Sequence, residues 1–293
     1  MPERAVRGVT LRYEIIGDDG PAIALNPGAR RPYDELVGLS ERIAEHGYRV
    51  LLHDRRNCGR SQLAIEPGGS EHEIWADDLY HLCNDLGLAP VFVGGASAGA
   101  RLALLFALRH PGAVRGLLLW RVTGGHHAAH TLADDYYGQY IALANSGGMA
   151  AVCASPHFAE CIRVRPKGRD ELMQIDVKKF VEVMETWRQA FIHSASLPVI
   201  GATEDQLKSL ALPICLIPGN DRIHDPAAAR KIAALAPQIT LYEGVVEDGP
   251  YGNLKEHWDP DEWHAAEPKL AAIFAGFLEA QSSLPARLHG AAR

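Results

Sequence analysis

The feature that most constrains the fold is a regular alternation of short apolar runs with amphipathic stretches. Six apolar runs fall at residues 22–28, 49–54, 90–95, 115–120, 213–219 and 239–246. Uninterrupted runs of this kind are typical of strands that are buried on both faces of a parallel sheet. Most stretches between them carry apolar residues three or four apart and stop at Gly or Pro, as crossover helices do. The pattern predicts an α/β fold with a mostly parallel, doubly wound sheet.

Two segments depart from this rhythm. The first, GVTLRYEIIG, alternates apolar and polar residues, which predicts an antiparallel edge strand. The second, from Gly124 to Leu212, is far too long for one crossover helix, and a structureless loop of that length is improbable in a compact domain. We therefore expect a core at 1–124 and 212–293, and an inserted helical lid at 125–211. One helix of this lid is predicted over 170–192, and its aromatic residues are expected to form the lid core rather than line a pocket.

Composition and charge exclude several classes of protein. The chain has 29 Lys and Arg against 36 Asp and Glu, a net charge of −7, and no basic cluster that would bind nucleic acid or an anionic membrane. It has no run of about 18 apolar residues that would span a bilayer and no secretory signal. Its five cysteines form no CxxC pair, so reduced thiols are expected. We predict a cytoplasmic protein with a small-molecule substrate and a homodimer as a possible assembly.

The most informative motif is GGASAGA at 94–100, which lies directly between an apolar run and a helical stretch. It contains Gly-x-Ser-x-Gly at a strand-to-helix junction, the arrangement that exposes a nucleophilic serine on a tight turn. The glycines let the strand and helix approach, and the N-terminus of the helix stabilises negative charge that develops beside Ser97. A plain glycine-rich turn is the alternative interpretation, and the flanking strand and helix disfavour it.

With these elements the sequence resembles the α/β-hydrolase superfamily over nearly its whole length. The motifs that carry the resemblance are NPGAR after the strand at 22–26, HDRRNCGRS after the next strand, GGASAGA, and PGNDRIHDP after the strand at 213–217. The resemblance implies a serine nucleophile, an acid and a histidine in that order along the chain. The partners of Ser97 are therefore sought downstream of it.

The acid is expected at the carboxyl end of a buried strand, where such folds place catalytic groups. Asp221 has this position. Asp225 is the alternative, but it directly precedes Pro226 and is explained as the N-cap of a helix. We therefore predict Asp221 as the carboxylate that orients the histidine.

By the resemblance, the histidine should follow the last strand, where the chain offers His257 and His264. Asp259, Pro260 and Glu262 fit a capping box, which would place His257 in a loop and His264 inside a helix. A loop histidine turns more easily toward Ser97, so His257 is predicted as the general base. The alternative is a helix that begins near Glu267, because Pro268 would interrupt an earlier one, and this would leave His264 in the loop.

The oxyanion hole is expected to combine the backbone N–H of Ala98 with that of Ala29. Pro27 lacks an N–H, and the family often has His-Gly where Pro27 and the following glycine stand here. Arg30 and Arg31 come next and are interpreted either as solvated arginines or as groups that meet an acidic substrate.

No metal and no organic cofactor is predicted. His126 and His130 are four residues apart, the spacing of two zinc ligands on a helix, but the glutamate of the zinc-peptidase pattern is replaced by His127. A position at the base of the lid is the favoured interpretation. His126 and His127 become candidates for the base only if neither downstream histidine acts.

The predicted function is hydrolysis of a small carboxylic ester, lactone or related acyl compound through a Ser-His-Asp acyl-enzyme mechanism. Two alternatives stay open. One is a carbon–carbon bond hydrolase of the same fold, in which Arg30 or Arg31 grips a substrate carboxylate. The other is a protein that binds a small ligand in a hydrolase-like pocket without turnover.

Overall fold

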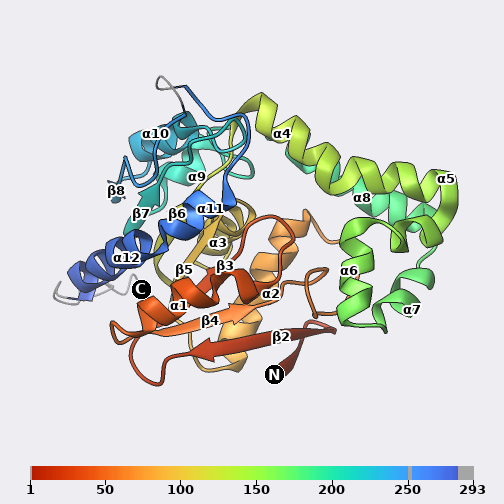
Figure 1. Ribbon diagram of the computed structural model, residues 1–293, viewed down its shortest axis with the longest axis horizontal. Coiled ribbons are helices and arrows are strands. Elements are labelled where there is room, and N and C mark those ends of the chain that lie inside the picture. Colours follow the sequence, from red (N-terminus) through yellow and green to blue (C-terminus); the bar gives the residue numbers. More distant parts are fainter. Residues whose placement is uncertain (1, 250–252, 283–293) are drawn as a thin grey trace, which may run out of the picture.

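A central eight-stranded sheet organises the computed structural model, which describes residues 2–249 and 253–282 (Figure 1). The strand order is β1-β2-β4-β3-β5-β6-β7-β8. β2 is antiparallel to β4, and the pairs from β4 through β8 are all parallel. The strands are β1 (Glu3–Val6), β2 (Val9–Ile16), β3 (Ala22–Asn26), β4 (Arg49–His53), β5 (Val91–Ala96), β6 (Val114–Trp120), β7 (Ile214–Ile217) and β8 (Ile239–Leu241). The predicted mostly parallel sheet is confirmed, and each of the six apolar runs overlaps one of the strands β3 to β8.

The N-terminal end of the sheet differs from the prediction. The alternating segment is β2 and is antiparallel, as expected, but β1 pairs outside it and forms the edge. The two strands are joined at Arg7 and Gly8, whose φ angles of 46° and 82° are those of a tight hairpin turn. β1 was not predicted because two of its four residues are charged, so it forms neither an apolar run nor a recognisable alternation.

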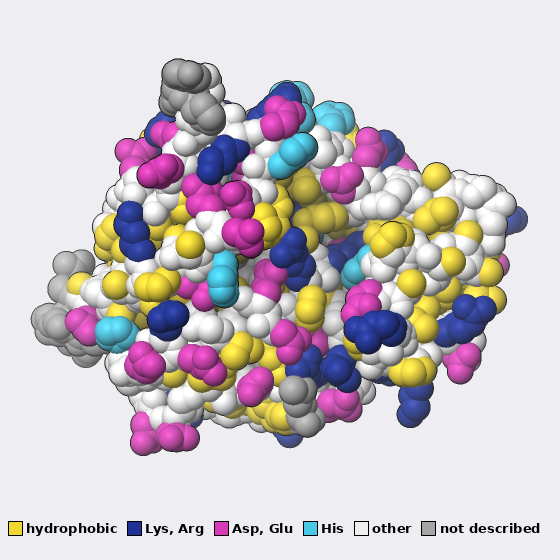
Figure 2. Space-filling view, viewed as in Figure 1, with side chains coloured by type: hydrophobic (Ala, Val, Ile, Leu, Met, Phe, Trp, Pro, Cys, Tyr) yellow, Lys and Arg dark blue, Asp and Glu magenta, His cyan; other side chains and the backbone are white. Residues whose placement is uncertain are grey.

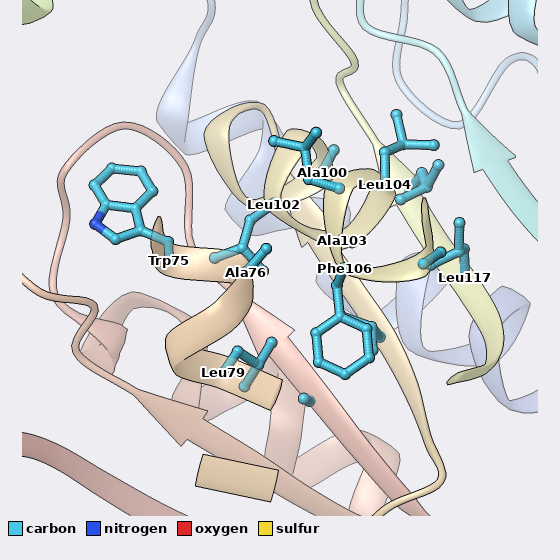
Figure 3. Close-up of a cluster of buried hydrophobic side chains, with 14 of the residues drawn as sticks. Trp75, Ala76, Leu79, Ala100, Leu102, Ala103, Leu104, Phe106 and Leu117 are labelled. Carbon is cyan, nitrogen blue, oxygen red and sulfur yellow. The ribbon is translucent and has the colours of Figure 1, made fainter. Parts of the chain in front are cut away.

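Helices cover both faces of the sheet. One face packs against α2 (Glu71–Asp85), α3 (Ala98–Arg109), α9 (Glu204–Lys208) and α10 (Pro226–Leu235), and Figure 3 shows part of this buried apolar cluster. The other face packs against α1 (Val37–Ala44), α11 (Pro260–Ala265) and α12 (Glu267–Ser282). Short 3-10 helices η1 (Tyr33–Leu36) and η2 (Pro111–Ala113) precede α1 and β6. Parallel strands with helices on both faces place all their carboxyl ends along one edge, where the loops of a site can meet.

A run of helices lies between β6 and β7 and forms a lobe to one side of the sheet (Figure 1). It consists of α4 (Gly125–Ala133), the π-helical turn η3 (Asp134–Gly138), α5 (Gln139–Cys153), α6 (Pro156–Val164), α7 (Gly168–Met173) and α8 (Val177–His193). We call residues 125–193 the helical lobe. Its aromatic side chains, such as Phe158, Phe180 and Trp187, are buried in a core that is separate from those of the sheet. The single helix expected over 170–192 is two helices, because the Asp176 side chain accepts the Lys179 N–H and caps the start of α8.

The C-terminal elements combine both boundaries considered for this region. Asp259 caps α11 by accepting the N–H groups of Asp261 and Glu262, and a new helix, α12, begins at Glu267 next to Pro268. All five cysteines are buried and unpaired. Among the described residues, no helix has the length and apolar character that a membrane span requires.

Candidate active site

Ser97 lies on the tight turn between β5 and α3. Its φ of 53° and ψ of −109° form a backbone conformation that residues other than glycine rarely adopt. Its N–H donates to the Trp120 carbonyl of β6, and its carbonyl accepts the Arg101 N–H of α3. A Cβ on Gly95 would clash with the Gly99 backbone, and one on Gly99 would clash with the Asn26 carbonyl. The motif therefore has glycines where the strand, the helix and the loop after β3 touch.

The histidine that contacts Ser97 is His224. Its Nε2 lies 2.9 Å from Ser97 Oγ, and its Nδ1 lies 2.7 Å from Asp221 Oδ2. Asp221 is fully buried, and His224 and Ser97 are 4% and 7% exposed, so the three groups interact out of bulk water. The other carboxylate oxygen of Asp221 accepts the backbone N–H groups of Ile223 and His224. One turn after β7 thus supplies and orients both partners of the serine.

The charges in this group favour a neutral histidine that can accept a proton. Burial raises the cost of ionising Asp221, but the His224 side chain and two backbone N–H groups outweigh it and hold the Asp221 pKa below its usual value. Burial lowers the pKa of His224, and the nearby charges of Arg121 and Arg101 lower it further, against the opposing effect of Asp221. With Asp221 ionised, Nδ1–H donates to the carboxylate, so Nε2 is left to accept the Ser97 hydroxyl.

The prediction that His257 reaches Ser97 is wrong in this structure. His257 is exposed, and His264 is exposed on α11 with its Nδ1 3.1 Å from Glu267. The reason is the pairing of Lys255, which donates its N–H to Asn220 and accepts the Arg222 N–H. This pairing holds the chain before His257 against the backbone of the acid loop. The position beside Ser97 is filled by His224.

A signal for His224 was present in the sequence. PGNDRIHDP places a histidine three residues after the predicted acid, just beyond the residue whose N–H an aspartate side chain accepts in a tight turn. The search began after β8 because the resemblance implies that position. The order of serine, acid and histidine along the chain is nevertheless kept.

The loop after β3 lies against Ser97, as an oxyanion loop would. A Cβ built on Gly28 would be 3.7 Å from Ser97 Cβ. The Gly28 N–H donates to Glu35, and the Gly28 carbonyl accepts Arg55 Nη2 at 3.2 Å and the Arg31 N–H at 3.3 Å. Because a trans peptide directs its C=O and N–H in opposite directions, these two donors orient the Ala29 N–H away from themselves.

Two further features bear on the predicted oxyanion donors. Ala29 has φ 39°, a strained angle for a residue with a side chain, and Arg55 Nη2 also binds the Ala29 carbonyl at 2.8 Å. Ala98 follows Ser97 and begins α3, so its N–H belongs to the electropositive end of that helix. Ala29 and Ala98 therefore stay the predicted donors, with geometry compatible with that role.

Arg30 and Arg31, the arginines considered for an acidic substrate group, already have carboxylate partners. Arg30 is buried and its Nη2 is 2.7 Å from Glu71, with Nη1 donating to the Tyr136 carbonyl. Arg31 is 3.0 Å from Glu35. These ion pairs connect the loop after β3 to Glu71 of α2 and to Glu35 of η1.

The histidines of GGHHAAH lie on α4, and among the described residues none of them bonds to Ser97, Asp221 or His224. The rings of His126 and His130 stack 6.3 Å apart, and both residues are exposed, as is His127. Across the described part of the chain, no group of three or more His, Cys, Asp or Glu side chains is arranged to hold a metal ion.

The fold is that of a hydrolase family. The family model described as the alpha/beta hydrolase fold matches residues 27–202, and the chain belongs to this family. Among curated relatives, it is 33% identical over 106 residues to the uncharacterized hydrolase YraK of Bacillus subtilis, covering 36% of this chain and 38% of that protein. It is 28% identical over 181 residues to a proline iminopeptidase of Clostridium botulinum, covering 53% and 60%. The matches thus span between about two fifths and three fifths of these relatives.

Solved structures show the same fold at low identity. An enol-lactonase from Burkholderia xenovorans superposes with a TM-score of 0.63 at 18% identity over 95% of this chain and 100% of its own. An esterase from Thermogutta terrifontis, solved with malate bound, gives 0.62 at 21% over 95% and 97%. A meta-cleavage product hydrolase from Pseudomonas fluorescens gives 0.63 at 16% over 96% and 98%. The protein is therefore an α/β hydrolase by family and by fold.

Proposed function

We propose that this protein hydrolyses a small carboxylic ester, lactone or related acyl compound through an acyl-enzyme on Ser97. The observation that carries the proposal is the buried chain of hydrogen bonds from Ser97 through His224 to Asp221, at 2.9 and 2.7 Å. A serine hydroxyl is a weak nucleophile until a neighbouring base removes its proton, and a base needs a third group to fix its tautomer. The three residues have the distances that these roles require.

In the first half of the proposed reaction, His224 Nε2 takes the Ser97 proton as Oγ attacks the substrate carbonyl. The carbonyl oxygen becomes an oxyanion, which the Ala29 and Ala98 N–H groups stabilise. His224 then gives the proton to the departing alcohol oxygen, and the acyl group stays on Ser97. In the second half, His224 removes a proton from water, the hydroxide attacks the acyl-enzyme, and Ser97 leaves with the proton restored.

We propose that the helical lobe serves as the lid of this site. Tyr136 from η3 and Phe191 from α8 have ring centroids 5.9 Å apart, and Phe191 also lies under the guanidinium of Arg101, one helical turn from Ser97. The lobe thus packs aromatic side chains against a residue in the first turn of α3, the helix that follows Ser97. In the proposed role, this apolar surface would exclude water from the acyl-enzyme. Figure 2 shows a hollow between the lobe and the sheet domain, with hydrophobic and basic side chains in it.

The test is active-site labelling combined with a single-turnover assay. A serine-directed fluorophosphonate should label the native protein, while Ser97→Ala should not react. Native protein should also release a burst of 4-nitrophenol from a short 4-nitrophenyl ester. Equal labelling of both proteins would remove Ser97 from the mechanism. Labelling without turnover of any ester or lactone, together with cleavage of a vinylogous diketone acid, would replace this proposal by carbon–carbon bond hydrolysis.

A further inference from the structure

Two buried arginines beside Ser97 have no carboxylate partner among the described residues. Arg121 is 7% exposed, and its side chain makes no hydrogen bond or ion pair there; its guanidinium lies over the rings of Trp258 and Trp263, at 4.6 and 5.1 Å. Arg101 is 3% exposed, with Nη2 donating to Thr123 and Nη1 3.0 Å from His72 Nε2. In the described part of the chain, the Nε atoms of both arginines are buried without a hydrogen-bond partner.

Both guanidinium groups belong to residues that the fold fixes next to the nucleophile. Arg121 directly follows Trp120, whose carbonyl accepts the Ser97 N–H. A Cβ added to Gly28 would be 3.7 Å from Arg121 Nη2. Arg101 lies one helical turn after Ser97 in α3. Both charges reach His224 closely enough to lower its pKa. Arg121 therefore reaches the loop that lies against Ser97, and Arg101 extends from the first turn of the helix that Ser97 begins.

This arrangement is costly for the protein alone. Taking a charged group out of water is strongly unfavourable unless an opposite charge compensates it. Burial lowers the pKa of Arg101 and of Arg121 to about 10, and the charges of Glu35 and Asp221, which form no ion pair with Arg121, offset this only in part. The Glu71 carboxylate, by contrast, raises the pKa of equally buried Arg30. Arg121 also holds φ 52°, an unfavourable angle for a residue with a side chain. A charge kept buried and unpaired at a strained position fits a site whose counter-charge arrives with the ligand.

We infer that the substrate carries a carboxylate, and that Arg121 and Arg101 bind this group next to Ser97. The inference rests on the proposed function and names its substrate class: an ester or lactone of a dicarboxylic or carboxylate-bearing acid. A guanidinium presents planar N–H donors that match a carboxylate, and the bond is strong where water is excluded. The inference also replaces Arg30 and Arg31 as the residues that would bind a substrate carboxylate, because both already pair with carboxylates of the protein.

The first experiment measures binding without turnover. Glutarate is titrated into Ser97→Ala protein by calorimetry, with glutaramide as the uncharged analogue and inorganic phosphate as a different anion. We expect glutarate to bind and glutaramide not to bind. Adding Arg121→Met should weaken glutarate binding by about 10- to 100-fold, the usual effect of losing a charge-assisted hydrogen bond. Arg115→Met, an exposed arginine of β6, is the matched control and should leave the affinity unchanged.

The second experiment compares mono-4-nitrophenyl glutarate with its methyl ester, which lacks the charge and is larger by one methyl group, after subtraction of spontaneous hydrolysis. Wild type should favour the charged ester in kcat/KM, and Arg101→Met and Arg121→Met should each reduce that ratio by about tenfold or more. Arg121→Lys keeps the charge and should retain part of the preference. This ratio is read within one protein, so a partly unfolded variant does not distort it.

The outcomes separate this inference from the proposed function. Glutarate binding to Ser97→Ala with no ester cleavage by wild type would keep the carboxylate site and remove the hydrolase proposal. Cleavage of both esters at equal kcat/KM, with no glutarate binding, would overturn the carboxylate site and keep the hydrolase. Phosphate binding as tightly as glutarate would overturn the assignment to carboxylates. Wild type and Ser97→Ala suffice for these readings even if an arginine variant does not fold.

Discussion

Asp221 and His224 belong to a single turn after β7, and the carboxylate of the first binds both the backbone N–H and the Nδ1 of the second. The acid and the base are therefore positioned by three residues of chain rather than by two separate loops. Their geometry depends on the buried end of β7, on the cap of α10 and on the backbone pairing of Lys255 with Asn220 and Arg222. The assignment of His224 as the general base can therefore be tested by substituting this residue alone.

His224→Ala should lower kcat/KM for a 4-nitrophenyl ester by roughly 10²- to 10⁴-fold, because it removes the base that activates Ser97. His257→Ala and His264→Ala are exposed-residue controls and should stay within a few fold of wild type. Steady-state kinetics on the three variants checks this. A large loss in His257→Ala with near-normal His224→Ala would return the base to the segment after β8.

Asp221→Asn should lower kcat by roughly 10³- to 10⁴-fold with a small change in KM, because a neutral amide no longer stabilises the protonated imidazole or selects its tautomer. Asp225→Asn is the matched control, since asparagine caps a helix as well as aspartate does and the Asp225 side chain caps α10 through the Ala227 N–H. Comparable activity in the two variants would show that Asp221 has no catalytic role.

The pH profile of kcat/KM should have an acid limb below pH 6.5, the ordinary pKa of histidine. The reason is that burial and two arginines lower the His224 pKa, so the imidazole stays neutral and able to accept a proton as the pH falls. Arg121→Met removes one of these charges and should move the limb to higher pH. An acid limb that is unchanged in this variant would mean that Arg121 does not act on His224.

Arg55 is expected to position the oxyanion loop, since its Nη2 holds the carbonyls of Gly28 and Ala29. Arg55→Met should lower kcat by about 10- to 100-fold with little effect on KM, because the loop donor would be misplaced for the transition state only. Affinity for a trifluoromethyl ketone inhibitor should fall in parallel, and Arg55→Lys should restore part of it. Arg49→Met, which loses a hydrogen bond to Gly20 at the surface, is the control. If Arg55 had only a structural role, Arg55→Met would change thermal stability without lowering kcat selectively over KM.

The buried histidine His53 should make the fold acid-sensitive. It is 1% exposed, its ring nitrogens have no hydrogen-bond partner among the described residues, and burial with the charge of Arg55 lowers its pKa to about 3. Between about pH 6.5 and 3 the unfolded chain binds a proton at this residue that the folded chain does not, so stability falls as the pH falls. Denaturant unfolding of His53→Leu should show a pH slope smaller by about 1.4 kcal/mol per pH unit in this range. An unchanged slope would contradict the neutral buried state.

The sequence by itself determined the architecture. Apolar runs such as VFVGG and CLI predict buried parallel strands because both faces of such strands are covered, and this is a local property of the chain. The turn around Ser97 was equally readable, because only glycines allow the approach of β5, α3 and the loop after β3. The N-caps Asp225 and Asp259 were predicted from the same local chemistry, and both cap their helices.

Only the tertiary structure decided which side chains meet Ser97. From the sequence, His224 and His257 are both expected in loops that follow a strand of the sheet. The pairing of Lys255 with the Asn220 and Arg222 backbone, a contact between distant segments, leaves the second exposed. Likewise, nothing in the sequence distinguishes Arg30 from Arg121. Glu71 pairs with Arg30, while among the described residues no carboxylate pairs with Arg121. Such partners are far apart along the chain, so the packing of α2 and β6 sets them and local patterns do not.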